Sequence, residues 1–500
     1  MTRSALPASL SSAFGAQLRG AFGLTLLALP VLGCHPGAPP APRVRPNIVV
    51  VLLDDADVEV TESMPRLRSM FIDTGVRFTA NIANTPLCGP ARATILSGQY
   101  AHNTKVYSNT GPNGGYVPWA AANSDDHHIG VWLQAQEYRT GLFGKYLNDF
   151  PAGRPETYVP RGWDDFRGIL SDREAHNNRF SLNENGTVTI YEAGTGGYQT
   201  DVLSQRLQAF IREGRGDRRP FFALLAVSAP HVPPEPAARH LTAFPGEKAA
   251  RKPSFDEADL SDKPKALREQ AAPLTRNQQE EIDETWRAMR RSLLSVEDSM
   301  EALIGTLGEL DELSNTYIFL ASDNGWFRGE HRIPAEKYAP YEESIRVPLM
   351  VRGPGIARDL QIDQVVGLVD LAPTILDLAG GDAPGREALD GRSIVPLLHL
   401  GKGAKLAWRE STLIEHFGGG APFRVRSYSG LRSATSTYVE YATGEREYYD
   451  LTKDPYQLEN IVSRLDEATS ARLHARVEAL KDCRAGACRM AEGESTLAAR

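Results

Sequence analysis

The run Asn47-Ile-Val-Val-Val-Leu-Leu53 is continuously apolar, and two acidic residues, Asp54 and Asp55, follow it directly. Two later runs have the same form: Phe221–Val227 ends before Ser-Ala-Pro-His231, and Tyr317–Ala321 ends before Ser-Asp-Asn324. Short apolar runs of this kind are typical of strands buried on both faces, as in a parallel or mixed α/β sheet. Binding sites in such sheets form beyond the carboxyl ends of the strands. We therefore expect a site at these strand ends, although Asp and Asn are also ordinary turn residues.

A second short segment, Leu87-Cys-Gly-Pro-Ala-Arg92, leads into a helix-like stretch that ends at Gly98. The first turn of a helix has free backbone N–H groups and the positive end of the helix dipole, so it favours a negative charge. A thiol at this position is expected to ionise more easily. Cys88 and Arg92, one helical turn apart, thus offer a nucleophile and a cation beside an anion-binding backbone. A buried structural cysteine is the alternative.

Oxygen donors follow the first and third apolar runs: Asp54, Asp55, Asp323 and Asn324. Such a set suits a hard cation such as Ca²⁺ or Mg²⁺ and does not suit Zn²⁺. A cation together with Arg92, Lys145 and His231 around one nucleophile describes a pocket for a tetrahedral oxyanion ester. The formal net charge of -8 argues against a nucleic-acid partner, so a local basic pocket must bind any anionic substrate.

The rest of the chain divides into a few broad segments. Residues 233–273 are rich in Pro and charge and predict a surface loop or lid. Apolar residues from Ile282 to Leu310 then recur at alternating spacings of four and three, which predicts a long amphipathic helix on the sheet; a coiled-coil face is the alternative. Beyond a boundary at 401–405, a smaller antiparallel subdomain is expected, with strands at 412–415, 425–431, 438–441 and 447–451 and a helix at 468–480.

The N-terminal residues 1–33 resemble a signal peptide. Their apolar part, Ala21–Gly33, is too short to span a bilayer, and it runs into Cys34 as in a bacterial lipobox. The Pro- and Ala-rich residues 34–46 predict an extended tether. We therefore expect an exported protein, periplasmic or at the cell surface, with a lipid anchor on Cys34; ordinary signal-peptide cleavage is the alternative. In that setting Cys483 and Cys488 are expected to form a disulfide, which leaves Cys88 unpaired.

Taken together, these motifs resemble a type I sulfatase of the alkaline phosphatase superfamily. The sulfatase signature is Cys-x-Pro-x-Arg followed by a helix with a Ser-Gly or Thr-Gly end, and residues 88–98 match it. The Asp-Asp, Gly-Lys-Tyr, Ala-Pro-His, Ser-Asp-Asn-Gly and Lys-Tyr-Ala-Pro-Tyr-Glu-Glu-Ser motifs match in the same order, over Pro46 to the C-terminus. Gly144–Asn148 and Val351–Ile356 are most similar to the branch of N-acetylglucosamine-6-sulfatases, arylsulfatases and extracellular endosulfatases.

The resemblance implies a fold and a chemistry. The fold is a large mixed, mostly parallel sheet flanked by helices over residues 47–400, with the antiparallel subdomain over 401–490 and a tail at 491–500. The chemistry begins when a formylglycine-generating enzyme oxidises Cys88 to Cα-formylglycine. One hydroxyl of its hydrate attacks sulfur in line, the alcohol leaves, and the second hydroxyl then expels sulfate. The implied substrate is a sulfated small molecule or glycan.

The resemblance also implies a role for each site residue. One Ca²⁺ would be held by Asp54, Asp55, Cys88, Asp323 and Asn324. Arg92 would hold the hydrate, Lys145 and Lys337 would bind sulfate oxygens, and His231 would deliver a proton to the leaving group. The basic residues also have structural alternatives: Lys145 and Lys337 could be surface lysines, His231 could be a hydrogen-bonded histidine at a strand end, and Arg92 could pair with an aspartate.

The chain departs from many sulfatases at Leu147, where those enzymes carry a histidine. Asn148 and His331 are the alternatives for that role. A phosphate or phosphonate ester hydrolase of the same superfamily, and a non-catalytic lipoprotein that binds sulfated glycans, are the competing functions. Loops such as 103–126 and 232–273 would set specificity, and they carry no readable code for the substrate.

Overall fold

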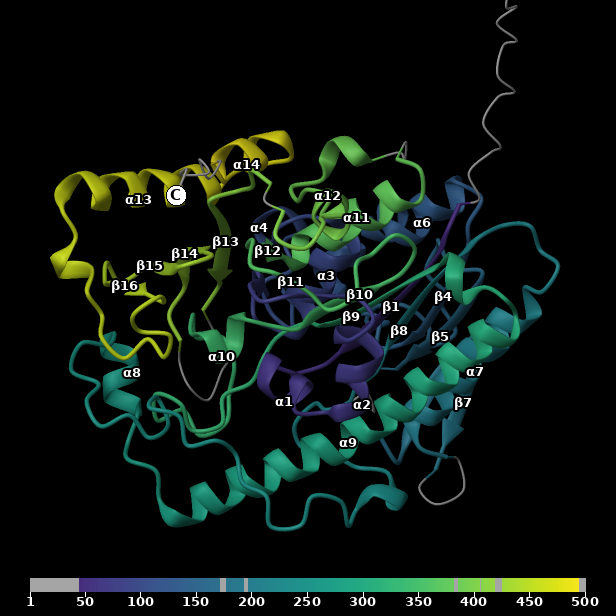
Figure 1. Ribbon diagram of the computed structural model, residues 1–500, viewed down its shortest axis with the longest axis horizontal. Coiled ribbons are helices and arrows are strands. Elements are labelled where there is room, and N and C mark those ends of the chain that lie inside the picture. Colours follow the sequence, from purple (N-terminus) through teal and green to yellow (C-terminus); the bar gives the residue numbers. More distant parts are fainter. Residues whose placement is uncertain are drawn as a thin grey trace, which may run out of the picture. The chain divides into compact units, whose positions relative to one another are not determined.

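The computed structural model describes residues 45–170, 177–192, 197–381, 385–404, 406–418 and 425–493 (Figure 1). The expected signal peptide, Cys34 and nearly all of the expected tether lie outside the described residues. The chain from Arg45 onward forms one compact unit. Among the described helices, none has both the length and the apolar character needed to cross a membrane.

A mixed ten-stranded sheet lies at the centre of this unit, in the order β11-β2-β10-β9-β1-β8-β4-β5-β6-β7. The three apolar runs of the sequence are its adjacent middle strands. β1 (Asn47–Leu53) pairs in parallel with β8 (Phe221–Ala226) on one side and with β9 (Thr316–Ser322) on the other, and all three are buried throughout. The expected α/β fold with a large mixed, mostly parallel sheet is confirmed.

The outer strands complete the mixed sheet. Parallel pairs join β8 to β4 and β4 to β5, whereas β10, β6 and β7 run antiparallel to their neighbours. The outer strands are β2 (Val76–Phe78), β4 (Arg139–Gly144), β5 (Asp165–Ile169), β6 (Phe180–Glu184), β7 (Thr187–Tyr191), β10 (Leu349–Arg352) and β11 (Leu360–Ile362). A separate two-stranded sheet pairs β3 (Asn81–Ile82) with β12 (Val366–Gly367).

Helices cover both faces of the sheet, because successive side chains of a strand point to opposite faces. Ile48, Val50 and Leu52 of β1 share an apolar cluster with α3 (Cys88–Ser97), α6 (Ile129–Ala135) and α11 (Leu371–Leu378). Val49, Val51 and Leu53 share another with α7 (Gln199–Glu213) and α9 (Arg276–Glu309) (Figure 1). The shorter helices are α1 (Val58–Glu62), α2 (Pro65–Leu67), α4 (Ala101–Thr104), α5 (Tyr116–Ala121), α8 (Lys265–Gln270), α10 (Glu342–Ile345) and α12 (Val395–Leu398).

The long amphipathic helix expected over residues 282–310 is α9, which packs on the sheet. It begins at Arg276, earlier than expected, because Thr275 and Gln278 form a capping box. Its first turns are polar and lack the apolar period, so only the Thr-x-x-Gln spacing could have marked the start. The segment expected as a surface loop or lid is fastened to α9 by ion pairs such as Arg239–Asp298 (2.9 Å).

A separate four-stranded antiparallel sheet follows, in the order β13-β14-β15-β16. Cys483 and Cys488 form the expected disulfide, and Cys88 is the free cysteine of the described residues. Buried contacts continue past residue 490, since Glu492 is fully buried. The elements lie close to the expected ranges: β13 (Ser411–His416), β14 (Tyr428–Ser433), β15 (Ser436–Tyr441), β16 (Arg446–Asp450), α13 (Glu467–Leu480) and the added α14 (Gly486–Ala491).

His128, at the start of α6, is a buried and uncharged histidine that makes stability depend on pH. Its Nδ1 accepts a hydrogen bond from the Gly130 N–H (3.1 Å), and its Nε2–H donates to the Arg161 carbonyl (3.1 Å). Burial lowers its pKa to about 4 from 6.5. Because the unfolded chain binds this proton more readily, the fold loses stability as pH falls from 6.5 towards 4.

We expect His128 alone to lower the free energy of unfolding by about 3 kcal/mol across that pH range. His128→Asn keeps an oxygen that can accept from the Gly130 N–H and removes the titration. Its stability should therefore fall less steeply than that of the unchanged protein. Urea unfolding at several pH values measures this difference, and parallel curves for the two proteins would rule out His128 as the titrating group.

Candidate functional site

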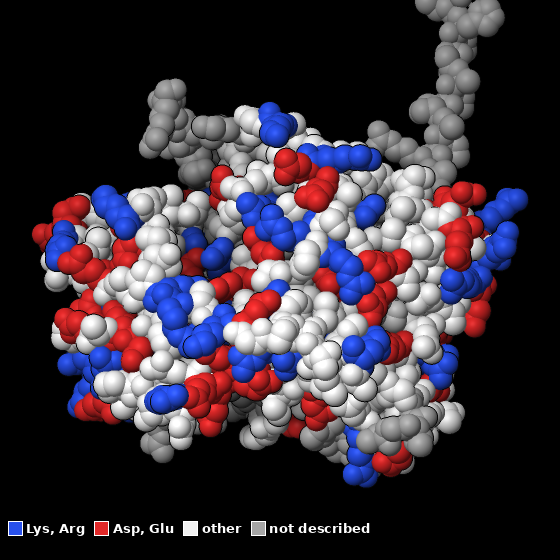
Figure 2. Space-filling view, turned by 60° about the horizontal axis from the view of Figure 1, so that its bottom comes forward, with Lys and Arg blue, Asp and Glu red and all other residues white. Residues whose placement is uncertain are grey.

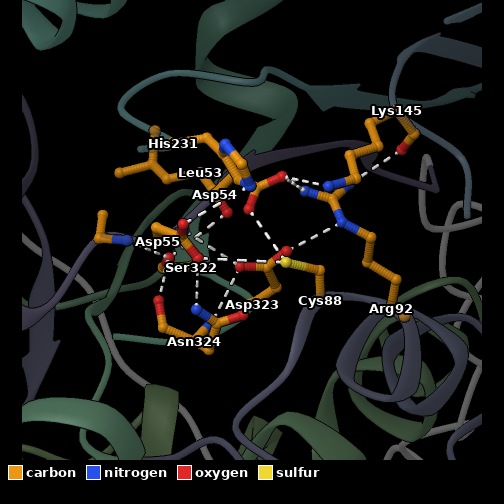
Figure 3. Close-up of polar contacts among 12 residues, drawn as sticks. Leu53, Asp54, Asp55, Cys88, Arg92, Lys145, His231, Ser322, Asp323 and Asn324 are labelled. Atoms are coloured by element: carbon orange, nitrogen blue, oxygen red, sulfur yellow. Dashed lines mark hydrogen bonds and ion pairs between the residues drawn. The ribbon is translucent and has the colours of Figure 1, made fainter. Parts of the chain in front are cut away.

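Two pairs of polar residues meet at the carboxyl ends of the middle strands, because β1 and β9 are parallel and their last residues are paired. Asp54 and Asp55 leave β1 beside Asp323 and Asn324, which leave β9 (Figure 3). Asp323 Oδ1 accepts from the Asp55 N–H (3.3 Å), and Asn324 Nδ2 donates to Asp55 Oδ1 (2.7 Å). The structure thus brings together the four oxygen donors that the sequence placed at strand ends.

Cys88 is the first residue of α3 and lies against these acids (Figure 3). Its Sγ lies 3.4 Å from Asp54 Oδ1, and Lys337 Nζ donates to Sγ at 2.9 Å. The preceding Leu87 is extended and provides no capping side chain. Asn109 Oδ1 instead accepts the N–H of Gly89 at 2.8 Å. The helix start therefore presents Cys88 to the acids and to one cation.

Three buried cations bind the acidic residues. Arg92 Nη2 and Lys145 Nζ both contact Asp54 Oδ2, at 3.1 and 2.7 Å. Arg92 Nε contacts Asp323 Oδ2 at 2.9 Å, and Lys337 Nζ contacts Asp55 Oδ1 at 2.5 Å. The two lysines are therefore not surface lysines, and the expected alternative of an Arg92–Asp ion pair is present within the cluster itself.

The buried charges change the ionisation of the cluster. Burial would raise the pKa of Asp54, but the charges of Lys145 and Arg92 hold it far below its usual range. Burial and the charge of Asp54 raise the pKa of the Cys88 thiol well above its usual value. The expectation that Cys88 ionises easily at the helix start is therefore wrong, because desolvation and a neighbouring carboxylate outweigh the charges of Lys145 and Lys337.

The donor set fits a hard cation. Within the described residues, Asp55 Oδ2 and Asn324 Oδ1 are buried and have no hydrogen-bond partner. Ligand atoms of Asp54, Asp55, Cys88 and His231 all lie within 4.8 Å of one another. Buried acceptor oxygens without donors are costly unless a cation or water satisfies them. Carboxylate and amide oxygens are the ligands that Ca²⁺ prefers.

His231 lies at the more open side of the cluster. Its Nε2 is 3.6 Å from Asp55 Oδ2, and its side chain is 23 % exposed while that carboxylate is fully buried. Burial lowers its pKa, although the charges of Asp55 and Asp54 act in the opposite direction. His231 is thus placed where a bound molecule and the acids could meet.

The position of the missing histidine, Leu147, and the two residues considered for its role are all buried. Leu147 is 1 % exposed and belongs to the apolar cluster on the α3 side of the sheet. The carbonyl of Asn148 accepts from the Tyr116 N–H (2.8 Å). His331 is fully buried, with Nδ1 2.6 Å from Glu257 Oε2. Of the histidines named from the sequence, His231 is the one placed beside the acidic cluster.

Two supporting residues were missed by the sequence reasoning. Ser322 Oγ accepts from the Ala56 N–H and donates to the Asn324 carbonyl, both at 3.0 Å, so it braces the turns after β1 and β9. Its place in the Ser-Asp-Asn motif was an available signal. Asn109, which binds the backbone beside Cys88, lies in a loop without a motif and had none.

One face of the molecule shows how its surface charges are distributed. On the face shown in Figure 2, Lys and Arg are interspersed with Asp and Glu and form no single extended basic area. This agrees with a formal net charge of -8. With a negative net charge overall, the buried cations near Cys88 are the groups expected to bind an anionic ligand.

Comparisons with known proteins identify related chains. The family model described as Sulfatase matches residues 46–381, and one described as N-sulphoglucosamine sulphohydrolase, C-terminal, matches 329–483. An arylsulfatase of Volvox carteri is 33% identical over 93% of this chain and 78% of its own. The N-acetylglucosamine-6-sulfatase of Homo sapiens is 32% identical over 89% of this chain and 86% of its own. A structure solved in complex with its substrate D-glucosamine-2-N,6-O-disulfate has a TM-score of 0.73 and 24% identity, over 87% of this chain and 97% of that one.

Proposed function

This chain belongs to the sulfatase family and is a sulfuric ester hydrolase, and on that premise we propose that it cleaves a sugar sulfate with a Cα-formylglycine made from Cys88. The placement of Cys88 supports this. Its thiol is fully buried, lies against Asp54 and has a raised pKa, which makes it a poor thiolate nucleophile. An aldehyde hydrate at residue 88 attacks through oxygen and needs no thiolate. The Sγ atom stands where that oxygen would be.

A Ca²⁺ ion held by Asp54, Asp55, Asp323, Asn324 and residue 88 completes the proposed site. The Asp55 and Asn324 oxygens that accept no hydrogen bond from the described residues support this set. When bound, the ion would supply positive charge for the attacking oxygen and for the sulfate oxygens.

The chain's own side chains divide the remaining work. Arg92, anchored on Asp54 and Asp323, would hold residue 88 and its charge. Lys145 and Lys337 would bind sulfate oxygens. A hydroxyl of residue 88 loses its proton as its oxygen bonds to sulfur, the bond from sulfur to the sugar oxygen breaks, and the sugar oxygen takes a proton. The second hydroxyl of the hydrate then loses its proton and expels sulfate, which regenerates the aldehyde. His231, partly exposed beside Asp55, is the proposed proton donor.

Maturation and location belong to the same proposal. Conversion of Cys88 requires a formylglycine-generating enzyme as a partner. The substrate class proposed is a sulfated sugar such as 6-O-sulfated N-acetylglucosamine, by similarity to the relatives above. We also propose export to the periplasm or cell surface with a lipid on Cys34, which the apolar run before that residue supports.

The proposal predicts both a mass change and an activity. In protein made together with a formylglycine-generating enzyme, the tryptic peptide 78–92 should have lost sulfur and two hydrogens and gained one oxygen. That protein should release sulfate from N-acetylglucosamine 6-sulfate, and chelation should stop the release until Ca²⁺ is restored. Mass spectrometry and ion chromatography measure these outcomes.

A matched pair of aryl sulfate and aryl phosphate serves as the control for reaction class. Faster turnover of the phosphate would favour a phosphoester hydrolase on the same fold. Full activity in protein whose Cys88 is unmodified would contradict the formylglycine.

A further inference from the structure

Three aromatic residues lie in or against segments that contact the residues around Cys88, and the chemistry proposed above does not use them. Tyr107 and Phe417 have ring centroids 4.1 Å apart with an angle of 38° between the rings. Tyr338 directly follows Lys337, the lysine that contacts Cys88. All three are partly exposed. We call these three residues the aromatic platform.

Tyr107 is held near the nucleophile by its own loop. Asn109 Oδ1 accepts the N–H of Gly89, the residue after Cys88, at 2.8 Å. The contact is close, because a Cβ on Gly89 would lie 2.8 Å from the carbonyl oxygen of residue 108. Tyr107 therefore stands two residues from a direct contact with the start of α3, in a loop that cannot move away without breaking that contact.

Phe417 follows a strand of the C-terminal sheet, and Tyr338, from the segment before α10, contacts the same sheet. Phe417 follows His416, the last residue of β13, and the His416 ring lies 5.4 Å from the Tyr338 ring. Tyr428 on β14 donates its hydroxyl to the Tyr338 carbonyl (2.8 Å). Contacts between Tyr107 and Phe417 then join the loop beside Gly89 to this sheet.

The backbone of Tyr338 supports a functional reading of the platform. Its φ is 79°, in the left-handed region, which costs a non-glycine residue roughly 1 kcal/mol or more. Such strain persists where surrounding contacts impose it, and it clusters at ligand-binding sites. Burial raises the pKa of Tyr338 to about 12, although the charge of the neighbouring Lys337 acts in the opposite direction.

We propose that the aromatic platform of Tyr107, Tyr338 and Phe417 binds the sugar ring that carries the sulfate. This deepens the proposed sulfatase function and rests on it. The acids and cations around Cys88 are buried, so the sugar must rest on the partly exposed side chains next to them. One face of a pyranose ring presents C–H groups, and aromatic rings bind such a face while leaving its hydroxyls to water or polar partners.

The first test measures binding without turnover. Cys88→Ala protein, with and without Phe417→Ala, is titrated in a calorimeter with N-acetylglucosamine 6-sulfate and separately with inorganic sulfate. Loss of the Phe417 ring should raise Kd for the sugar sulfate about 3- to 10-fold. Kd for inorganic sulfate, which has no ring to stack, should stay within about 2-fold.

A ring-conserving variant and a kinetic measurement complete the test. Phe417→Trp should bind the sugar sulfate about as well as Phe417 itself does. In matured active protein, Phe417→Ala should raise KM with little change in kcat, since stacking is shared by ground and transition states.

Two results would overturn the platform: an unchanged Kd for the sugar sulfate, or an equal loss of affinity for both ligands, which would indicate a structural role only. The sulfatase proposal fails separately, if matured protein releases no sulfate while the binding difference remains.

Discussion

Cys88→Ala should abolish sulfate ester hydrolysis, with kcat/KM falling by at least about 10⁴-fold, while the protein remains folded. The substitution removes the thiol group from which the aldehyde is made, so no hydrate oxygen can form at residue 88, and it leaves the cations and acids of the site in place. Lys337 keeps its contact with Asp55 (2.5 Å), so no buried charge is left alone. Loss of one buried sulfur should change the free energy of unfolding by only about 1 kcal/mol. Sulfate release and urea unfolding on the same samples measure the two effects.

A control on the same helix separates chemistry from packing. Ser97 is the last residue of α3, is buried, and donates its hydroxyl to the Ala93 carbonyl (2.7 Å). Ser97→Ala removes one buried oxygen far along the helix from the acids and should keep near-normal turnover. Protein in which Cys88 is present but not oxidised should be as inactive as Cys88→Ala. Appreciable turnover by Cys88→Ala would mean that the nucleophile lies elsewhere.

The middle of the fold and most of the site could be predicted from the sequence, for one physical reason. Strands buried on both faces are continuous apolar runs, and the residues that follow parallel strands meet at one edge. Asp54 and Asp323 are therefore juxtaposed by strand register, although they lie far apart in the chain. Cys88 and Lys145 could be predicted as site residues from the short motifs around them, because these motifs depend only on local spacing in the sequence.

What could not be predicted depends on the surroundings that tertiary packing creates. The sign of the Cys88 pKa shift is set by burial and by Asp54, neither of which is visible at a helix start. Phe417 lies beside Tyr107 because the end of β13 packs against the loop that follows α4. Neither residue belongs to a motif, and neither shows a periodic pattern that would bring them together.

A buried ion network near the C-terminal end likewise depends on tertiary packing. Arg409 is fully buried; its Nη2 lies 2.6 Å from Asp370 Oδ1 and its Nη1 lies 2.9 Å from Glu492 Oε1. Asp370 ends the 3-10 turn before α11, and Glu492 follows α14. In the sequence all three resemble surface residues, because charged side chains are rarely fully buried. Only their packing shows that they join the end of α14 to the start of α11, one of the helices on the main sheet.

Arg409→Met should lower the free energy of unfolding by about 3–5 kcal/mol. The methionine fills most of the volume, but it leaves two buried carboxylates close together with less positive charge between them. Arg392 still contacts Glu492 at 2.6 Å, so the network is weakened and not emptied. Urea unfolding at neutral pH measures the loss. Sulfate turnover by the folded fraction should be nearly unchanged, since the ion pairs around Cys88 do not include Arg409 or its partners.

Arg472→Met is the matched control, because Arg472 pairs with Glu410 (3.1 Å) but its side chain is 58 % exposed. Exposed ion pairs contribute little, so this variant should change stability by less than about 1 kcal/mol. The two variants thus carry the same substitution at two ion pairs that differ in burial. If the two variants were equally stable, solvent would have to reach Arg409, and the last helix would be held by the disulfide and its apolar contacts instead of by charge.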